Sequence, residues 1–142
     1  MKGLRTDEEK TVAQLIDEFN FHPLTAKIYV EYNGKCAYCG LDLLETTVKY
    51  HSGVIDRVLP KTNYPELEWN ESNLALSCFT CSDLKGDYDV LEPNNNNTSE
   101  ILQEHKRAMI DKIKRELSKR MQTIENERIR VKQIVRGDYK IS

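Results

Sequence analysis

The chain has 142 residues and a formal net charge of −2 at pH 7, with 39% hydrophobic and 31% charged residues. This length predicts one domain with at most a short appendage, and the charge excludes a uniformly basic nucleic-acid binder. No apolar run approaches the roughly 20 residues of a membrane span, and the N-terminus has no basic and then apolar secretion signal. We therefore expect a cytoplasmic protein with no membrane segment.

The small net charge hides an asymmetry along the chain. Residues 100–142 contain 12 Lys and Arg against 7 Asp and Glu, whereas the first 99 residues contain 9 against 16. Attraction to nucleic-acid phosphates would therefore come from local patches or from the C-terminal segment. The alternative for that segment is a solvated helix face, and both interpretations stay open.

The N-terminal segment, residues 1–33, is expected to be helical. Thr6 precedes three acidic residues, which is typical of a helix start because acids favour the positive end of the helix dipole. Pro23 is expected to open a second helix that ends at Asn33-Gly34. The first helix carries an apolar stripe that we expect to lie in the core: Val12, Leu15, Ile16 and Phe19.

All four cysteines of the chain fall in two Cys-x-x-Cys pairs, Cys36 with Cys39 and Cys78 with Cys81. Four thiolates complete the tetrahedral shell of a structural zinc ion, so this spacing predicts one Zn²⁺. Disulfides are the less favoured use in a chain expected inside the cell. Zinc binding of about 10–16 kcal/mol exceeds what so small a core supplies, so chelation should unfold the middle of the protein.

The segment between the two cysteine pairs is expected to contain extended chain. Residues 47–59 are rich in β-branched residues and predict a strand or hairpin that ends near Pro60. A polar loop, residues 61–71, follows. Its Tyr64 and Trp69 either pack this loop or stack on a nucleic-acid base, and packing is the preferred interpretation.

The chain after the second cysteine pair is expected to form a short helix and then a long one. Residues 93–99 read as a linker with four asparagines, and residues 100–137 as a long amphipathic helix. Apolar residues recur there every seven positions, at Ile110, Leu117, Ile124 and Val131. This helix either pairs with a partner as a coiled coil or folds back over the core of its own domain, and both alternatives stay open.

The order of these motifs resembles the zinc-braced HNH endonuclease family over residues 33–87. Between and after the cysteine pairs lie Asp56-Arg57, Pro60-Lys61, Asn73-Leu74 and Lys85-Gly86-Asp87. Residues 64–69 resemble the branch that includes the HNH subunit of Septu-type antiviral defence systems. The resemblance implies an α+β fold in which residues 34–92 form a ββα-metal core, braced by the four-cysteine zinc site and flanked by the N-terminal helices and the long C-terminal helix.

The resemblance also assigns roles to individual residues. Asp56 matches the acid that binds the catalytic metal, Mg²⁺ or Mn²⁺, and Asn73 matches the loop asparagine that orients a catalytic histidine. Arg57 stands where the family carries that general-base histidine, and Ser82 stands where it carries an asparagine or histidine metal ligand. Asp83 would serve as the ligand if the helix were rotated by one residue, although it reads more simply as an acid at a helix N-terminus.

Arg57 changes the expected chemistry. A guanidinium stays protonated, so Arg57 cannot take a proton from water, although it can hold a phosphate. Loss of a general base costs about 10²–10⁴ in rate, so weak hydrolysis would survive. His51 would reach the site only if Ser52-Gly53 folded the chain back. Lys61 and Lys85 are expected to contact phosphates, or else to be solvated.

Two functions follow from the sequence. The first is an HNH-type nuclease that cleaves DNA, or alternatively RNA; the second is a catalytically impaired, zinc-braced module that binds nucleic acid or a partner protein. The long helix favours a protein partner or a homodimer in either case. The Septu-like interpretation implies an ATPase as that partner, and it would be a separate protein because this chain has no Walker loop.

Overall fold

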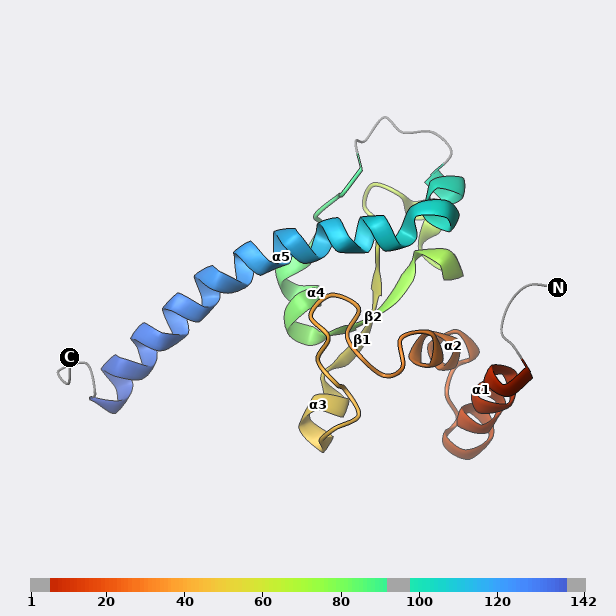
Figure 1. Ribbon diagram of the computed structural model, residues 1–142, viewed down its shortest axis with the longest axis horizontal. Helices are drawn as coiled ribbons and strands as arrows, with labels where there is room; N and C mark the ends of the chain where they lie inside the picture. The colour runs from red at the N-terminus through yellow and green to blue at the C-terminus, as the bar shows by residue number, and fades with distance from the viewer. Residues whose placement is uncertain (1–5, 92–97, 138–142) are drawn as a thin grey trace.

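The computed structural model describes residues 6–91 and 98–137, and Figure 1 shows their arrangement. Within these ranges the chain is mixed α and β. No helix in these ranges combines the length and the apolar character needed to cross a membrane. The elements in chain order are α1 (Thr6–Phe19), α2 (Pro23–Glu31), α3 (Thr47–His51), β1 (Gly53–Arg57), the 3₁₀ turns η1 (Pro65–Leu67) and η2 (Glu71–Asn73), β2 (Leu74–Cys78), α4 (Phe79–Lys85) and α5 (Thr98–Arg136).

The two strands form an antiparallel pair at the centre of the molecule. Gly53 lies opposite Cys78 and Arg57 lies opposite Leu74, and the long connection of residues 58–73 joins the strands. All five residues of β2 are buried. Because α4 follows β2 without a gap, the second cysteine pair lies at the junction between strand and helix.

The strand expected over residues 47–59 is shorter than predicted. Residues 53–57 are extended, but Thr47–His51 forms the helix α3, so the prediction was wrong for this part. The Thr46 side chain accepts a hydrogen bond from the Lys49 amide at 3.1 Å and so begins a helical turn, which overrides the strand propensity of the β-branched residues. His51 ends this helix and is exposed.

The two N-terminal helices are confirmed, but the first buries little. Val12 is buried on α1, whereas Phe19 at its end is 67% exposed, so the expectation that the whole apolar stripe lies in the core was wrong. Ala26 and Ile28 anchor α2 in the core. His22 precedes α2, where its Nδ1 accepts a hydrogen bond from the amide of Leu24 at 3.1 Å.

The long C-terminal helix divides into a packed part and a protruding part. It begins at Thr98 and has non-helical dihedrals at His105, while residues 93–97 of the expected linker lie outside the described residues. The buried side chains of its first half join the same hydrophobic core as the sheet, which confirms folding back for this half. Figure 1 shows the second half extending away from the rest of the chain. The buried residues are Leu102, Met109, Ile110, Ile113 and Leu117.

Two cations of α5 attach this helix to the backbone near the strands and α4. The ammonium of Lys106 donates to the carbonyl of Leu74 at the start of β2, at 2.8 Å. The Nη1 of Arg120 donates to the carbonyl of Leu84 near the end of α4, at 2.7 Å. Since terminal helix carbonyls have no partner within the helix, Arg120 completes α4 from outside.

Candidate functional site

The four cysteines converge at one point between the Cys36–Cys39 turn and the junction of β2 with α4. Their sulfur atoms all lie within 4.8 Å of one another, and Cys39 and Cys78 are 3.8 Å apart. Zinc–sulfur bonds of about 2.3 Å in a tetrahedron place sulfurs about 3.8 Å apart. No disulfide joins the cysteines. The cluster is therefore close enough to bind one metal ion such as zinc.

The four thiols lie close enough to shift one another's pKa values in opposite directions. Hydrogen bonds with Cys39, and then with Cys78 and Cys81, lower the pKa of Cys36 far below its ordinary value. Hydrogen bonds with the other three raise the pKa of Cys81. A bound divalent cation would take all four as thiolates and release their remaining protons.

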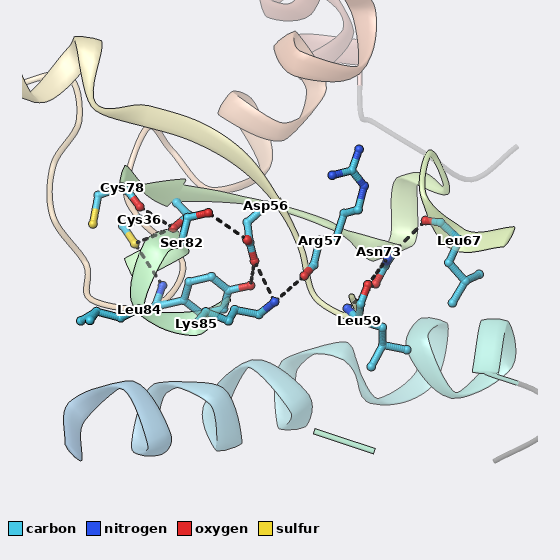
Figure 2. Close-up of polar contacts among 12 residues, drawn as sticks. Cys36, Asp56, Arg57, Leu59, Leu67, Asn73, Cys78, Ser82, Leu84 and Lys85 are labelled. Carbon is cyan, nitrogen blue, oxygen red and sulfur yellow. Dashed lines mark hydrogen bonds and ion pairs between the residues drawn. The ribbon is translucent and has the colours of Figure 1, made fainter. Parts of the chain in front are cut away.

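Asp56 is the centre of a second cluster beside the cysteines. Its carboxylate is nearly buried, 9% exposed, on the face of β1 that is turned toward α4. Oδ2 accepts a hydrogen bond from the Tyr38 hydroxyl at 2.7 Å, and Oδ1 accepts one from the Ser82 hydroxyl at 3.2 Å. The ammonium of Lys85 lies 3.3 Å from Oδ2. Figure 2 shows Ser82 and Lys85 approaching Asp56 from α4.

Tyr38 was not anticipated as a site residue, although it lies between two cysteines. Its side chain is buried at 3% exposure. Burial, and then the negative charge of Asp56, raise the pKa of the Tyr38 phenol well above its usual value. Tyr38 therefore remains a neutral hydrogen-bond donor to Asp56 at any physiological pH. A tyrosine inside a Cys-x-x-Cys turn was the signal available in the sequence.

Lys85 has different partners from the phosphate expected from the sequence. It is 2% exposed, and its ammonium donates to the carbonyl oxygen of Arg57 at 2.7 Å while pairing with Asp56. A buried ammonium needs a counter-charge and hydrogen-bond acceptors. Lys85 therefore neutralises Asp56 and connects the end of α4 to the end of β1.

Ser82 faces Asp56 from α4, and its neighbour Asp83 is exposed. Successive residues of a helix point about 100° apart, so both cannot face Asp56 at once. The rotation that would bring Asp83 to the metal is therefore not the arrangement observed. The role of either residue as a metal ligand stays a prediction.

Asn73 holds the loop that follows β1. Its side chain is fully buried; Oδ1 accepts from the Leu59 amide at 2.7 Å, and Nδ2 donates to the carbonyls of Leu59 and Leu67 at 3.0 and 3.2 Å. These bonds, drawn in Figure 2, fix the backbone at Leu59, two residues after Arg57, and at Leu67, two residues before Trp69. Asn73 thus orients this loop, while its match to the family's asparagine stays a prediction.

Arg57 points away from the cluster around Asp56, as Figure 2 shows. Adjacent residues of a strand face opposite sides, so Asp56 and Arg57 diverge. The Arg57 Nε donates to the carbonyl of Glu68 at 2.9 Å, and its guanidinium lies 4.9 Å from the ring centre of Trp69. Lys61 is 3.5 Å from the Glu68 carboxylate.

The two aromatic residues of this loop differ in their environment. Tyr64 is 4% exposed and belongs to the core, as expected. Trp69 is 66% exposed, so the expectation that it packs the loop was wrong.

The oxygen atoms around Asp56 fit a divalent ion that keeps most of its water. A carboxylate oxygen has two acceptor positions, and Oδ2 uses both for Tyr38 and Lys85. Oδ1 retains one beside the Ser82 hydroxyl. Mg²⁺ is commonly held by one or two carboxylates together with water and substrate phosphate. In the described part of the chain, Asp56 belongs to no cluster of three potential metal-binding side chains, so a cage made only of protein ligands does not fit.

Comparison with known proteins gives one similarity. The chain is 36% identical over 85 residues to the Septu protein PtuB of Bacillus thuringiensis. The match covers 54% of this chain and 32% of the relative, so the chain spans about a third of that relative's length. No protein-family model and no solved structure matches the chain. The similarity supports the Septu part of the resemblance, whereas membership of the HNH family is not shown.

Zinc binding is testable on the purified protein. We expect one zinc ion per chain by elemental analysis, and loss of that ion in Cys81→Ser. Chelation should abolish cooperative unfolding, and adding Zn²⁺ but not Mg²⁺ should restore it, because only zinc suits four thiolates. Unchanged unfolding after complete zinc removal, or disulfides in the denatured protein, would contradict a structural zinc site.

The buried pair of Asp56 and Lys85 predicts a specific stability pattern. Lys85→Met should lower the free energy of unfolding by about 3–5 kcal/mol, because it leaves the carboxylate buried without a counter-charge. The double variant Asp56→Asn/Lys85→Met should recover part of this loss. Lys119→Met, at an exposed position of α5, is the matched control and should change little. Urea denaturation measures all three, and equal stability of Lys85→Met and Lys119→Met would refute the pairing.

Proposed function

We propose that the chain is an HNH-type nuclease of a Septu-like antiviral defence system, which hydrolyses phosphodiester bonds of nucleic acid, with DNA as the expected substrate. The observation that carries this proposal is the buried carboxylate of Asp56, which receives donors from both zinc-braced segments through Tyr38 and Ser82. The order of strand, strand and helix around it agrees with a ββα-metal core. The similarity to a Septu protein supports the defence context.

The residues around Asp56 would have distinct roles in this reaction. Asp56 Oδ1 and Ser82 Oγ would hold a hydrated Mg²⁺ or Mn²⁺, which supplies Lewis-acid stabilisation of phosphate charge when bound. Tyr38 and Lys85 fix the carboxylate on its other oxygen. Arg57 supplies no base, since a guanidinium keeps its proton, and its side chain contacts Glu68 and Trp69 on the other face of β1.

A second candidate function is a binding module without hydrolysis. Two observations favour it: the ammonium of Lys85 already balances the charge of Asp56, and Arg57 contacts Glu68 and Trp69 instead of facing Asp56. A counter-charge at Asp56 lowers the affinity of the carboxylate for a metal ion, because the two cations repel each other. In this alternative the zinc-braced fold presents a surface for nucleic acid or protein.

A protein partner belongs to either proposal. The protruding part of α5, residues 122–136, exposes apolar side chains on a helix that continues beyond the core. We assign this segment to contact with a partner, either a second copy of the chain or a separate ATPase. The exposed apolar residues are Ile124, Ile129, Val131, Ile134 and Val135.

Plasmid nicking with Mg²⁺ or Mn²⁺ tests the nuclease proposal. We expect slow nicking by the unmodified chain and none by Asp56→Asn, because the amide binds a divalent ion poorly. Asp17→Asn is the matched control, because it removes one exposed carboxylate of α1, and should keep full activity. Melting curves of each variant separate lost chemistry from lost folding.

Arg57→His distinguishes the two candidate functions. A rise in rate of about 10²–10⁴ would identify a nuclease scaffold in which residue 57 supplies the base. No activity in any variant, with DNA binding intact, would refute the nuclease proposal and support the binding module. Nicking that persists in Asp56→Asn would contradict the assignment of the site.

A further inference from the structure

Trp69 is an exposed aromatic ring that contacts Arg57, the neighbour of Asp56 on β1. It is the only tryptophan of the chain and lies in the connection between β1 and β2. Its side chain is 66% exposed, whereas Leu67 two residues earlier is buried at 3%. Tryptophan is usually largely buried in a folded monomer, so a ring left this open needs an explanation.

The ring is nevertheless held in place. The guanidinium of Arg57 lies over it, 4.9 Å from the ring centre, and the same side chain donates to the carbonyl of Glu68 at 2.9 Å. Asn73 donates to the carbonyl of Leu67 and so anchors the backbone next to this segment. Trp69 is thus a pre-positioned surface with a cation against the ring and a large part open to solvent.

The surroundings of the ring are charged and polar. Lys61 and Arg57 both approach the carboxylate of Glu68, each at 3.5 Å. The chain neighbours of Trp69 are the polar residues Glu68 and Asn70. A planar π surface with a guanidinium against it suits the stacking of a base.

We propose that Trp69, positioned by Arg57 and next in the chain to Glu68, which pairs with Lys61, is a stacking platform for an unpaired base of single-stranded nucleic acid. The proposal rests on the proposed function only in taking nucleic acid as the ligand; it holds for a nuclease and for a binding module alike. A base within a duplex is already stacked on its neighbours, so the platform selects single strands or frayed ends. Stacking tolerates any base, so little sequence preference follows.

This role accounts for arginine at position 57. Arginine bonds the Glu68 carbonyl while its flat guanidinium lies against the ring, and a histidine has a shorter side chain with only two ring nitrogens for such contacts. Arg57 is therefore a positioning residue that acts through Trp69. Since Glu68 offsets part of the positive charge of Arg57 and Lys61, we expect binding here to depend only weakly on salt.

The sole tryptophan provides the test. Its fluorescence is titrated with single-stranded oligodeoxythymidine, with the same strand annealed to its complement, and with inorganic polyphosphate, which carries charge without bases. No Mg²⁺ or Mn²⁺ is added, so binding is measured without cleavage. We expect saturable quenching by the single strand, much weaker quenching by the duplex and none by polyphosphate.

Variants assign the effect to this platform, with affinity measured from the anisotropy of a labelled strand. Trp69→Ala should weaken binding about tenfold, and Trp69→Phe should weaken it less because a ring remains. Tyr50→Ala, which removes another exposed aromatic side chain, is the matched control and should bind normally. Arg57→Gln should weaken binding and increase the rotational mobility of Trp69 in the free protein, and Arg57→Lys should recover part of both.

Several outcomes would overturn the proposal. One is unchanged fluorescence with every nucleic acid, which would assign the exposed ring to a protein contact. The others are equal quenching by the single strand and by polyphosphate, and equal affinity of Trp69→Ala and Tyr50→Ala for the labelled strand. These outcomes are distinct from failure of the nuclease proposal, which is tested by plasmid nicking and its loss in Asp56→Asn. Quenching without nicking would support the platform in a binding module.

Discussion

The arrangement of the candidate site depends on one cross-link, the cluster of four cysteines that joins two distant segments of the chain. Cys36 and Cys39 enclose Tyr38, while Cys81 directly precedes Ser82. The two hydroxyls that reach Asp56 are therefore each adjacent in sequence to a cysteine of this cluster. A structural zinc ion would fix these donors more firmly than the small core could, because zinc binding contributes folding free energy directly.

The site balances two opposing electrostatic demands. A buried carboxylate needs compensation for lost hydration, and Tyr38, Ser82 and Lys85 supply it. The same three groups compete with any divalent cation for the Asp56 carboxylate. One acceptor position, on Oδ1 beside Ser82, is left for such a cation. The opposite face of β1 serves a different purpose, since Arg57 there is engaged with Glu68 and Trp69. Strand alternation thus separates the candidate reaction centre from the candidate base platform by a single residue.

Features set by the spacing of residues along the chain were predictable from the sequence. Features set by contacts between residues far apart in the chain were not. The cysteine cluster follows from its spacing, and the helices at Thr6 and Pro23 follow from their start signals. The helix over residues 47–51 was missed because a threonine cap outweighed strand propensity. The burial of Lys85 and the exposure of Trp69 depend on side chains brought together by the fold, namely Asp56 and Arg57, and no spacing rule reports such contacts.

The most direct test of this account is a crystal structure of the protein grown with Mn²⁺, with anomalous data collected at the zinc and manganese edges. The account predicts a zinc peak bonded to four sulfurs at about 2.3 Å. It also predicts a manganese peak beside Asp56 Oδ1 and Ser82 Oγ, with Tyr38 and Lys85 retained on Oδ2. Zinc absent from the cysteines, or no manganese at Asp56 under saturating Mn²⁺, would contradict a zinc-braced site that holds a divalent ion.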